Sequence, residues 1–505
     1  MSVPAELINS GMNLQTLLRG MVDAPAIELH GIASDSRLVG EGYVFLACAG
    51  EDSHGLDFTQ QAIDAGAVAI VYDAESIGDT SLDSAVPMIA MPGLHQRIGE
   101  IANRWFHSPS DALSVIAVTG TNGKTTVAML LARCLQLLGR HTGYIGTLGK
   151  GISELTDSGG LTSPACIELH GSLAEFRDQK ATHAAIEVSS HALAQGRTDG
   201  VQFDSAIFTN LSRDHLDYHG GMQSYFDSKA RLFTDNALNH RIINIDSEFG
   251  LELADRCDSN VVEVSTRVDR EATERPFVIA RSVVAGDRGS LIRFETSWGE
   301  IEFEIQMPGD FNVENVALVL ALLLRHGIPL SEAGSVLSLV SAPPGRMQRV
   351  EVTSDVPLPS VFIDFAHTPD GLEKALHAIR LHCEGELWCV FGCGGDRDRG
   401  KRPQMGAVAS RLADHIIVTS DNPRTENAAA IIDDILAGMT GEPTVVEDRA
   451  VAIAHAINSC DDNATVLIAG KGHELIQIIG KESIPFSDFD IAVANLEVRS
   501  RRSAG

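Results

Sequence analysis

The sequence has few of the features that mark membrane, secreted or metal-framework proteins. Its longest apolar stretch, Val316 to Leu324, is far shorter than the roughly 18 residues that a membrane-spanning helix needs. Its eight cysteines are scattered through 505 residues without a C-x-x-C pair, so neither a disulfide framework nor a zinc site is expected. The N-terminal residues have no basic segment followed by an apolar run, as a secretion signal would. We therefore expect a cytoplasmic protein without a membrane span.

Basic residues are also scarce. The chain has 39 Lys and Arg against 68 Asp and Glu, which gives a formal net charge of -29. A chain of this charge is repelled on average by phosphate backbones and by anionic membranes, so no nucleic-acid partner is expected. An anionic ligand would need a local site built from a few cationic side chains and helix N-termini.

The length and the pattern of apolar segments predict an α/β protein of three domains. A single hydrophobic core stops growing near about 250–300 residues. Breaks at His107-Ser108-Pro109 and at Ala342-Pro343-Pro344-Gly345 are typical of boundaries. We place a small α/β domain at residues 1–108, a central parallel-sheet domain resembling P-loop ATPases at 109–341, and a Rossmann-like domain at 342–505.

Short apolar segments predict the strands of these domains. Period-two alternation over 261–306 predicts an antiparallel addition to the central sheet, followed by a helix over 312–326. The basic residues 498–505 are expected to fray. Parallel strands are expected at 67–73 in the first domain and at 115–120, 184–188, 205–208 and 241–245 in the second. In the third domain the expected strands are the segments VFIDF, LWCVF, HIIVT and TVLIAG.

The strongest local motif is TGTNGKTT, Thr119 to Thr126, between an apolar strand and an amphipathic helix. The backbone amides of such a loop, the helix dipole and the lysine ammonium together bind phosphates, and a Thr hydroxyl can reach Mg²⁺. The motif is a variant, because Val118 stands where a Walker A motif has Gly. The alternative is a glycine-rich turn without a ligand. The residues predicted to bind ATP are Gly120, Thr121, Asn122, Gly123, Lys124, Thr125 and Thr126.

Polar residues follow the next strands of the central domain. Glu187 and its neighbours follow one strand, and the segment from Asn210 to Asp217 follows another. Carboxyl ends of parallel strands form the usual ligand-binding edge, and carboxylates there can hold Mg²⁺. The alternative is that each acidic residue caps a helix or lies in solvent. Lys229 lies in a helix-like segment, where spacing alone indicates a surface lysine.

Four segments of the third domain follow predicted strands in the same way. They contain Asp364, Arg397, Asp421-Asn422-Pro423-Arg424 and Gly470 to Glu474, and we expect them to line one crevice. Each could instead be a turn. The segment from Gly392 to Arg397 lacks the third glycine of a dinucleotide fingerprint, so dinucleotide binding is disfavoured.

Taken together and in this order, the motifs resemble those of the Mur ligases. The resemblance covers essentially the whole chain. The motifs that carry the resemblance are, in chain order, GTNGKTT, EVSSHAL, NLSRDHLDYHG, GDFNVENVAL, PPGRMQ, DFAHTPDGL, GCGGDRDRGKRPQMG, SDNPRTEN and GKGHE.

The resemblance implies an ATP-driven amide ligation through an acyl-phosphate in cytoplasmic peptidoglycan precursor synthesis. It is strongest to members that add meso-2,6-diaminopimelate to UDP-N-acetylmuramoyl-L-alanyl-D-glutamate. The implied cofactors are ATP and Mg²⁺, and the implied partners include transient cell-wall synthesis complexes. Lys124, Lys229, Glu187 and His215 match catalytic positions. Of these, Glu187 and His215 match Mg²⁺ ligands together with Thr125, and Lys229 matches a lysine that is carbamylated.

Other positions match the family's binding residues. For ATP these are Asn312, Asn315, Arg346 and Asp364; for the UDP-muramoyl substrate, Ser34, Ser36, Thr162, Ser163, Ser189, Gln195 and Arg197; for the amino acid, Arg397, Asp421, Asn422, Pro423, Arg424, Gly470 and Glu474.

Alternative functions are a lysine-adding ligase, a folylpolyglutamate or cyanophycin-type synthetase, and a nucleotide-binding scaffold of cell-wall assembly. DNPR together with GDRDRGKRP argues against the second. The scaffold is disfavoured because Lys124, Glu187, His215 and Lys229 are all present. Arg424 favours diaminopimelate over lysine, because a planar guanidinium can bind the additional carboxylate through two hydrogen bonds. Otherwise DNPR is only an Asp-capped turn that opens a helix at Ala428.

Overall fold

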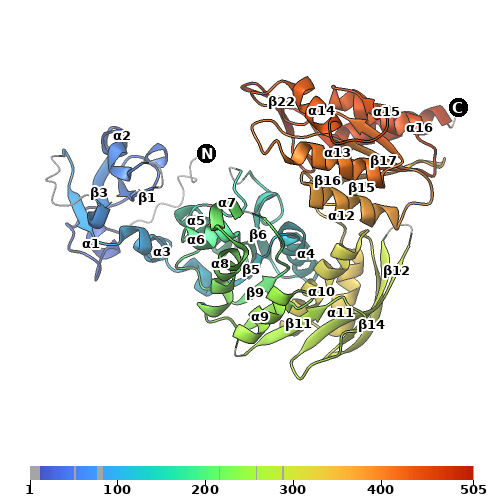
Figure 1. Cartoon of the computed structure of the whole chain (residues 1–505). Coiled ribbons are helices and arrows are strands. Elements are labelled where there is room, and N and C mark those ends of the chain that lie inside the picture. The colour runs from blue at the N-terminus through green and yellow to red at the C-terminus, as the bar shows by residue number, and fades with distance from the viewer. Residues whose placement is uncertain are drawn as a thin grey trace. The chain divides into compact units, whose positions relative to one another are not determined.

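Parallel sheets covered by helices make up most of the chain (Figure 1). The structure is a computed structural model that describes residues 12–50, 53–76, 84–157, 160–214, 216–257, 259–286 and 289–503. The chain forms two compact units: unit 1 contains Met1–Lys124, Leu135–Ile243 and Ser247–Val261, and unit 2 contains Thr125–Cys134, Asn244–Asp246 and Val262–Gly505. No helix in the described ranges has both the length and the apolar character needed to cross a membrane.

The first sheet of unit 1 is parallel, with strand order β1-β2-β3-β4. Its strands are β1 (Gly31–Ala33), β2 (Tyr43–Ala47), β3 (Ala67–Asp73) and β4 (Met88–Met91). Alternate residues of β2 enter different cores: Val44 packs with helices α1 (Leu14–Leu17) and α3 (Leu94–Trp105), and Phe45 packs with α2 (Thr59–Asp64). Because successive side chains point to opposite faces, both faces are covered, and the α/β fold expected for the first domain is confirmed.

A second group of strands in unit 1 has the order β10-β9-β5-β8-β6-β7. All neighbours are parallel except β6 and β7. Residues 115–118 of β5 are fully buried, as expected of a parallel strand covered on both faces. The strands are β10 (His240–Asn244), β9 (Ser205–Phe208), β5 (Ser114–Thr119), β8 (His183–Glu187), β6 (Thr142–Gly146) and β7 (Gly149–Gly151).

Helices join the strands of unit 1, including the amphipathic helix that the sequence predicted after the glycine-rich loop. Short 3₁₀ helices are η1 (Ser36–Leu38), η2 (Gly55–Phe58), η3 (Ala74–Ser76) and η4 (Pro109–Ala112). The α-helices are α4 (Lys124–Leu137), α5 (Cys166–Asp178), α6 (Ser190–Ala194), α7 (Leu216–His219), α8 (Met222–Thr234) and α9 (Glu248–Arg256).

The first group of strands in unit 2 has the order β14-β13-β12-β11. The antiparallel prediction for 261–306 is confirmed for β12 (Phe277–Ala285), β13 (Ser290–Thr296) and β14 (Gly299–Ile305). It is wrong for β11 (Val261–Ser265), which is parallel to β12, because the connection over 266–276 is long enough to return the chain in the same direction. The helix expected over 312–326 is α10 (Asp310–Arg325), and α11 (Leu330–Leu339) follows.

The second sheet of unit 2 has the order β15-β16-β20-β17-β18-β19. Its neighbours are parallel apart from β15 and β16, which confirms the predicted βα pattern. Alternate residues again enter different cores: Phe362 packs with α12 (Pro369–Arg380), and Val361 packs with α15 (Arg449–Ser459). The strands are β15 (Gln348–Val350), β16 (Ser360–Asp364), β20 (Thr465–Ala469), β17 (Leu387–Phe391), β18 (His415–Val418) and β19 (Thr444–Val445).

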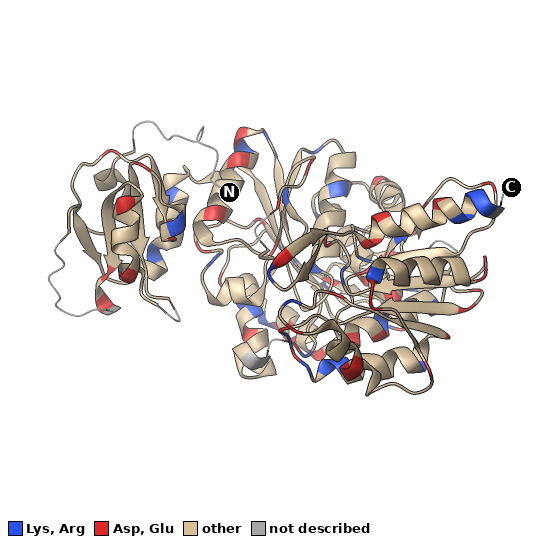
Figure 2. Cartoon of the chain, turned by 90° about the horizontal axis from the view of Figure 1, so that it is seen from above, with Lys and Arg blue, Asp and Glu red and all other residues tan. Residues whose placement is uncertain are grey.

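Two features that follow β20 along the chain were not predicted. An antiparallel hairpin of β21 (Ile476–Ile479) and β22 (Glu482–Pro485) follows β20. The predicted fraying at 498–505 is wrong for residues 498–503, because α16 (Asp488–Ser503) continues through them. Its last turn carries Arg501 and Arg502 (Figure 2), and cations there favour the helix C-terminus. The remaining helices are α12 (Pro369–Arg380), α13 (Lys401–Leu412), α14 (Ala428–Leu436) and α15 (Arg449–Ser459).

Candidate active site

The glycine-rich loop lies between the carboxyl end of β5 and the first turn of α4. Gly120 and Gly123 have φ values of 147° and 85°, in the region that favours glycine. A Cβ on Gly120 would lie 1.9 Å from Thr209 Oγ1, so no other residue fits there. The loop therefore presents a helix N-terminus of the kind that binds anions.

The loop that follows β9 holds this glycine-rich loop in place. Thr121 N donates to Asn210 O at 2.9 Å, and Asn122 N donates to Asn210 Oδ1 at 3.0 Å. Thr209 Oγ1 donates to Asn122 O at 2.6 Å. Strand β5 lies between β8 and β9, so the loops that follow all three strands meet at one edge of the sheet, as the sequence predicted.

Two lysine ammonium groups meet at a single carbonyl oxygen of the loop. Lys124 Nζ donates to Gly120 O at 2.9 Å and to Thr121 O at 2.8 Å. Lys229 Nζ, on α8, also donates to Gly120 O at 2.9 Å. Lys229 is 1% exposed, so the sequence-based interpretation of a surface lysine is wrong.

Burial changes the chemistry of Lys229. Its pKa is lowered well below the usual value, mainly because burial disfavours the charged form and also because of the nearby Lys124 ammonium; Asp214 opposes this shift. Its Nζ also lies 4.7 Å from the centroid of the Tyr225 ring. A low pKa increases the fraction of neutral amine, which is the nucleophilic form of a lysine.

Glu187 ends β8 and is completely buried. Its Oε1 accepts hydrogen bonds from Tyr144 Oη at 2.5 Å and from Thr147 N at 2.9 Å, and its Oε2 accepts one from Thr147 Oγ1 at 3.2 Å. A Cβ on Gly146 would lie 2.1 Å from Oε1. Sequence reasoning missed both Tyr144, which lies within β6, and Thr147, which directly follows β6. The predicted partner His215 lies outside the described residues.

Several residues predicted to bind the UDP-muramoyl substrate form one polar network beside Glu187. Ser163 Oγ donates to Glu187 O at 2.8 Å and accepts from Ser189 N at 3.1 Å. Arg197 Nη1 donates to Ser163 O at 3.0 Å, and Arg197 Nη2 donates to Gln195 Oε1 at 2.6 Å. Thr162 joins the network through a hydrogen bond of 3.2 Å from Thr147 Oγ1 to its own Oγ1.

The two predicted serines of the first sheet differ in their surroundings. Ser34 is exposed. Ser36 is buried, and its Oγ donates to Gln61 Oε1, on α2, at 3.1 Å. The hydroxyl of Ser36 therefore also contributes to local packing.

The residues of unit 2 predicted to bind ATP form two local groups. Asn312 and Asn315 are buried on α10, where Asn315 Nδ2 donates to Asn312 Oδ1 at 3.2 Å. Asp364 ends β16 and accepts from Met347 N at 2.7 Å. The guanidinium carbon of Arg346 lies 4.7 Å from the centroid of the Phe365 ring.

The DNPR segment follows β18, beside the end of β20. A Cβ on Gly470 would lie 2.7 Å from Asp421 Oδ2, and Asn422 Nδ2 donates to Glu474 Oε2 at 2.7 Å. Arg424 has a left-handed backbone, with φ 49°, and its Nη1 donates to Gly395 O at 2.8 Å. These segments come together as the sequence predicted.

Two details of this region bear on the sequence-based alternatives. Helix α14 is capped by Asn427, whose side chain accepts from Ala430 N at 3.1 Å, so the interpretation of DNPR as an Asp-capped turn that opens this helix is wrong. Pro423 is buried. Arg397 is exposed, and its Nη1 donates to the neighbouring carbonyl of Asp396 at 3.2 Å.

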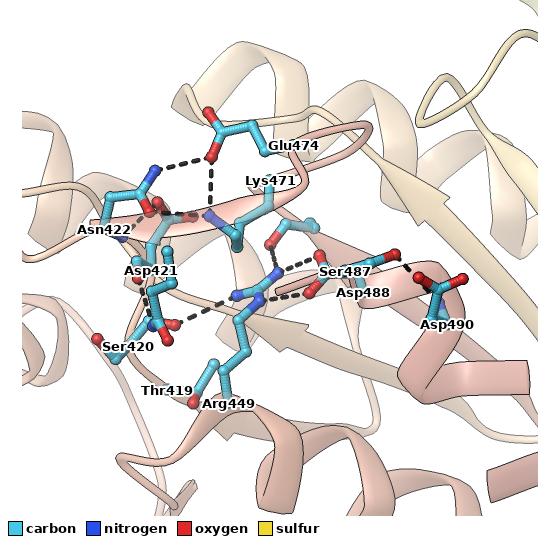
Figure 3. A network of polar contacts seen from close by, with 12 residues as sticks. Thr419, Ser420, Asp421, Asn422, Arg449, Lys471, Glu474, Ser487, Asp488 and Asp490 are labelled. Atoms are coloured by element: carbon cyan, nitrogen blue, oxygen red, sulfur yellow. Dashed lines mark hydrogen bonds and ion pairs between the residues drawn. The ribbon is translucent and has the colours of Figure 1, made fainter. Parts of the chain in front are cut away.

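A fully buried ion pair lies next to the DNPR segment (Figure 3). Arg449 Nε and Nη2 donate to Asp488 Oδ1 and Oδ2, both at 2.7 Å, and both side chains have no exposed surface. Arg449 Nη2 also donates to Ala469 O at 3.0 Å. The guanidinium thus connects α15, α16 and the end of β20, and sequence reasoning missed it.

Comparisons with known proteins agree with this architecture. Three family models match consecutive segments: the Mur ligase family, catalytic domain, over 28–106, the Mur ligase middle domain over 118–323, and the Mur ligase, glutamate ligase domain over 345–472. A UDP-N-acetylmuramoyl-L-alanyl-D-glutamate--2,6-diaminopimelate ligase from Coxiella burnetii (strain RSA 493 / Nine Mile phase I) is 43% identical over 467 residues, which are 92% of this chain and 95% of that protein.

Solved structures show the same likeness. The structure of a UDP-N-acetylmuramoyl-L-alanyl-D-glutamate--2,6-diaminopimelate ligase is 32% identical, with a TM-score of 0.70, and the match covers 97% of this chain and 99% of that chain. MurF from Acinetobacter baumannii is 19% identical, with a TM-score of 0.63 and coverage of 92% and 95%, and supports the fold alone. The chain belongs to the Mur ligase family.

The Arg449–Asp488 pair leads to a prediction about stability. Asp488→Asn should lower the free energy of unfolding by about 3–5 kcal/mol, because it leaves a buried guanidinium without its counter-charge. The control is Asp490→Asn, at an exposed residue in the same first turn of α16. It should change the free energy of unfolding by less than about 1 kcal/mol. Calorimetric melting of both variants checks this. Equal melting temperatures for the two variants would contradict it.

Proposed function

We propose that this protein is the ATP-dependent ligase that joins meso-2,6-diaminopimelate to UDP-N-acetylmuramoyl-L-alanyl-D-glutamate, in the cytoplasm, during peptidoglycan precursor synthesis. The observation that carries the proposal is the convergence of Lys124 and Lys229 on Gly120 O. This arrangement places the Lys124 ammonium at a glycine-rich loop and beside it a buried amine, in a chain whose net charge is strongly negative. The Coxiella relative, named for the same reaction, supports the choice of substrates.

The first step is the transfer of a phosphoryl group. A carboxylate oxygen of the UDP-linked substrate bonds to the γ-phosphorus of ATP, the bond to the bridging oxygen breaks, and ADP leaves. The amides of the loop from Gly120 to Thr126 and the Lys124 ammonium stabilise the charge on the transferring group. In this proposal Asn312, Asn315, Arg346 and Asp364 contact the nucleotide.

The residues present suit a Mg²⁺ ion. Mg²⁺ prefers hard oxygen ligands, and the buried carboxylate of Glu187 and the hydroxyl of Thr125 are such ligands. We assign His215 to the same set from the family motif. When bound, Mg²⁺ neutralises charge on phosphate oxygens.

Lys229 joins this set after carbamylation. The neutral amine attacks CO₂, an N–C bond forms and a proton is released, which turns a cation into a carboxylate-like group. Burial of Lys229 favours this reaction, because it lowers the pKa of the amine. The resulting anion would also be attracted to the Lys124 ammonium, which shares its carbonyl partner.

The second step forms the amide. The neutral amine of diaminopimelate attacks the acyl-phosphate carbon, the C–N bond forms, the C–O bond to the phosphate breaks, and the proton lost by the amine leaves with the phosphate as hydrogen phosphate. Arg424 binds the distal carboxylate, and Glu474 with the Gly470 carbonyl accepts the distal ammonium. Asp421, Asn422, Pro423 and Arg397 complete this site.

The UDP-muramoyl substrate is assigned to a separate set of polar residues. The network beside Glu187 offers hydroxyl, amide and guanidinium groups that can bind its sugar, phosphate or peptide oxygens. The assigned residues are Ser34, Ser36, Thr162, Ser163, Ser189, Gln195 and Arg197.

An ADP-release assay tests the function. Purified protein with ATP, Mg²⁺ and UDP-N-acetylmuramoyl-L-alanyl-D-glutamate should release ADP with meso-diaminopimelate and far less with L-lysine or L-ornithine. The Lys124→Met variant, which keeps the bulk but loses the charge, should be slower by about 10²–10³-fold or more. Release that does not depend on the amino acid would contradict ligation, and equal use of L-lysine would contradict the choice of acceptor.

Carbamylation predicts chemical rescue. Lys229→Ala should lose most activity and regain part of it when short carboxylates such as formate are added, because the missing group is an anion. Sodium chloride at the same ionic strength should give no recovery, and Lys374→Ala, at an exposed lysine, should behave as the unmodified protein. Lys229→Ala with full activity without additives would rule the carbamate out.

Arg424 predicts the selectivity for diaminopimelate. Lysine lacks the second carboxylate, so it leaves the guanidinium partly unpaired at a penalty of about 1–3 kcal/mol, or roughly tenfold to a hundredfold in discrimination. Arg424→Lys should therefore raise the KM for meso-diaminopimelate far more than the KM for ATP. The matched control is Arg399→Lys at an exposed arginine. An unchanged KM for meso-diaminopimelate in Arg424→Lys would disprove the assignment.

A further inference from the structure

Lys471 is a buried cation that the proposed mechanism does not use. It follows β20 directly, between Gly470 and Gly472, and its side chain has no exposed surface. Its Nζ donates to Asn422 Oδ1 at 2.9 Å and to Glu474 Oε2 at 2.8 Å (Figure 3). It also donates to Ile476 O at 2.8 Å. A lysine ammonium has three hydrogens, so these three acceptors use its full donor capacity.

Lys471 determines which way the Asn422 amide faces. Asn422 Oδ1 accepts from Lys471 Nζ and from Ile478 N at 3.0 Å. Two donors at this position require the oxygen, so the amide nitrogen must face the other way. There it donates to Glu474 Oε2 at 2.7 Å.

The same cation orients the Glu474 carboxylate. Among the described residues, the hydrogen-bond donors to this carboxylate are Lys471 and Asn422, and both reach Oε2. The side chain of Glu474 is 31% exposed. Its second oxygen, Oε1, is therefore left for a donor that arrives from outside the network, such as a substrate ammonium.

Lys471 also connects the DNPR segment to the β21–β22 hairpin. Its contact with Ile476 O is joined by hydrogen bonds from Arg424 N to Ile478 O at 3.1 Å and from Gly480 N to Arg424 O at 2.7 Å. Arg424 needs such support, because its left-handed backbone is unfavourable for a residue with a side chain. The hairpin and Lys471 thus hold the backbone that carries the Arg424 side chain.

We propose that Lys471 is a positioning residue that determines specificity for the amino-acid acceptor. It aligns Asn422, Glu474 and, through the hairpin, Arg424 on the distal carboxylate and ammonium of meso-diaminopimelate. This inference rests on the proposed function and assigns a role to a residue that contacts the acceptor only through its neighbours. A lysine that serves only to fill the core would affect stability without separating one substrate from another.

The test compares Lys471→Met with Lys481→Met, which removes an exposed lysine at the turn of the same hairpin. The full-length proteins are assayed for ADP release while ATP, UDP-N-acetylmuramoyl-L-alanyl-D-glutamate and meso-diaminopimelate are varied in turn. For Lys471→Met the KM for meso-diaminopimelate should rise about 10–100-fold, as expected for lost hydrogen bonds to charged groups. The other two KM values should stay within about twofold, and the preference over L-lysine should fall.

A second comparison separates positioning from general destabilisation. In a Glu474→Gln background, Lys471→Met should raise the KM for meso-diaminopimelate by less than about threefold, because residues that act together are not additive. Lys471→Gln, which keeps two hydrogen-bond donors, replaces the Met variant if the latter does not fold.

Either of two results would overturn the inference. One is a folded Lys471 variant with an unchanged KM for meso-diaminopimelate, and the other is a variant in which all three KM values rise together. The unmodified protein is assayed alongside. If it shows no release dependent on meso-diaminopimelate, the proposed function itself fails, and the two failures are thereby distinguished.

Discussion

The carbonyl oxygen of Gly120 is the point on which the chemistry of the central sheet depends. Two ammonium groups, from the start of α4 and from the middle of α8, share it at 2.9 Å. Burial disfavours the charged form of Lys229 and lowers its pKa, and the nearby Lys124 ammonium adds to this effect. The arrangement is therefore suited to ligands that bring negative charge, which a phosphate at the loop and a carbamate at Lys229 would both supply.

Parallel topology explains why these groups meet although they are far apart in sequence. Strand β5 has β8 on one side and β9 on the other, so the glycine-rich loop, Glu187 and Asn210 follow neighbouring strand ends. Close approach then restricts the sequence at two points. Gly120 lies against Thr209, and Gly146 lies against Glu187, and a side chain at either glycine would push apart the loops that form the site.

The polar segments that follow the strands of the C-terminal sheet obey the same topological rule but are supported differently. Their polar residues lie at the ends of β17, β18 and β20, where buried charges are paired rather than solvated. Arg449 is paired with Asp488, and Lys471 with Glu474. Removing these ions from water is unfavourable. The ion pairs therefore contribute mainly by fixing the geometry of the neighbouring loops. A specificity site for a zwitterionic amino acid needs such fixed geometry, since both signs of charge must be matched at once.

Much of this protein is determined by the sequence itself. The glycine-rich loop before an amphipathic helix, the alternation of β13 and β14, and the βα repeats of the C-terminal sheet follow from local spacing, and each is present. Three features depended on tertiary structure: the burial of Lys229, the Tyr144 and Thr147 donors to Glu187, and the Lys471 network with its hairpin. The physical reason is that burial and pairing arise from segments distant in sequence. The sequence around Lys229 predicts a surface lysine on a helix. In the structure a loop more than a hundred residues away in sequence covers this side chain.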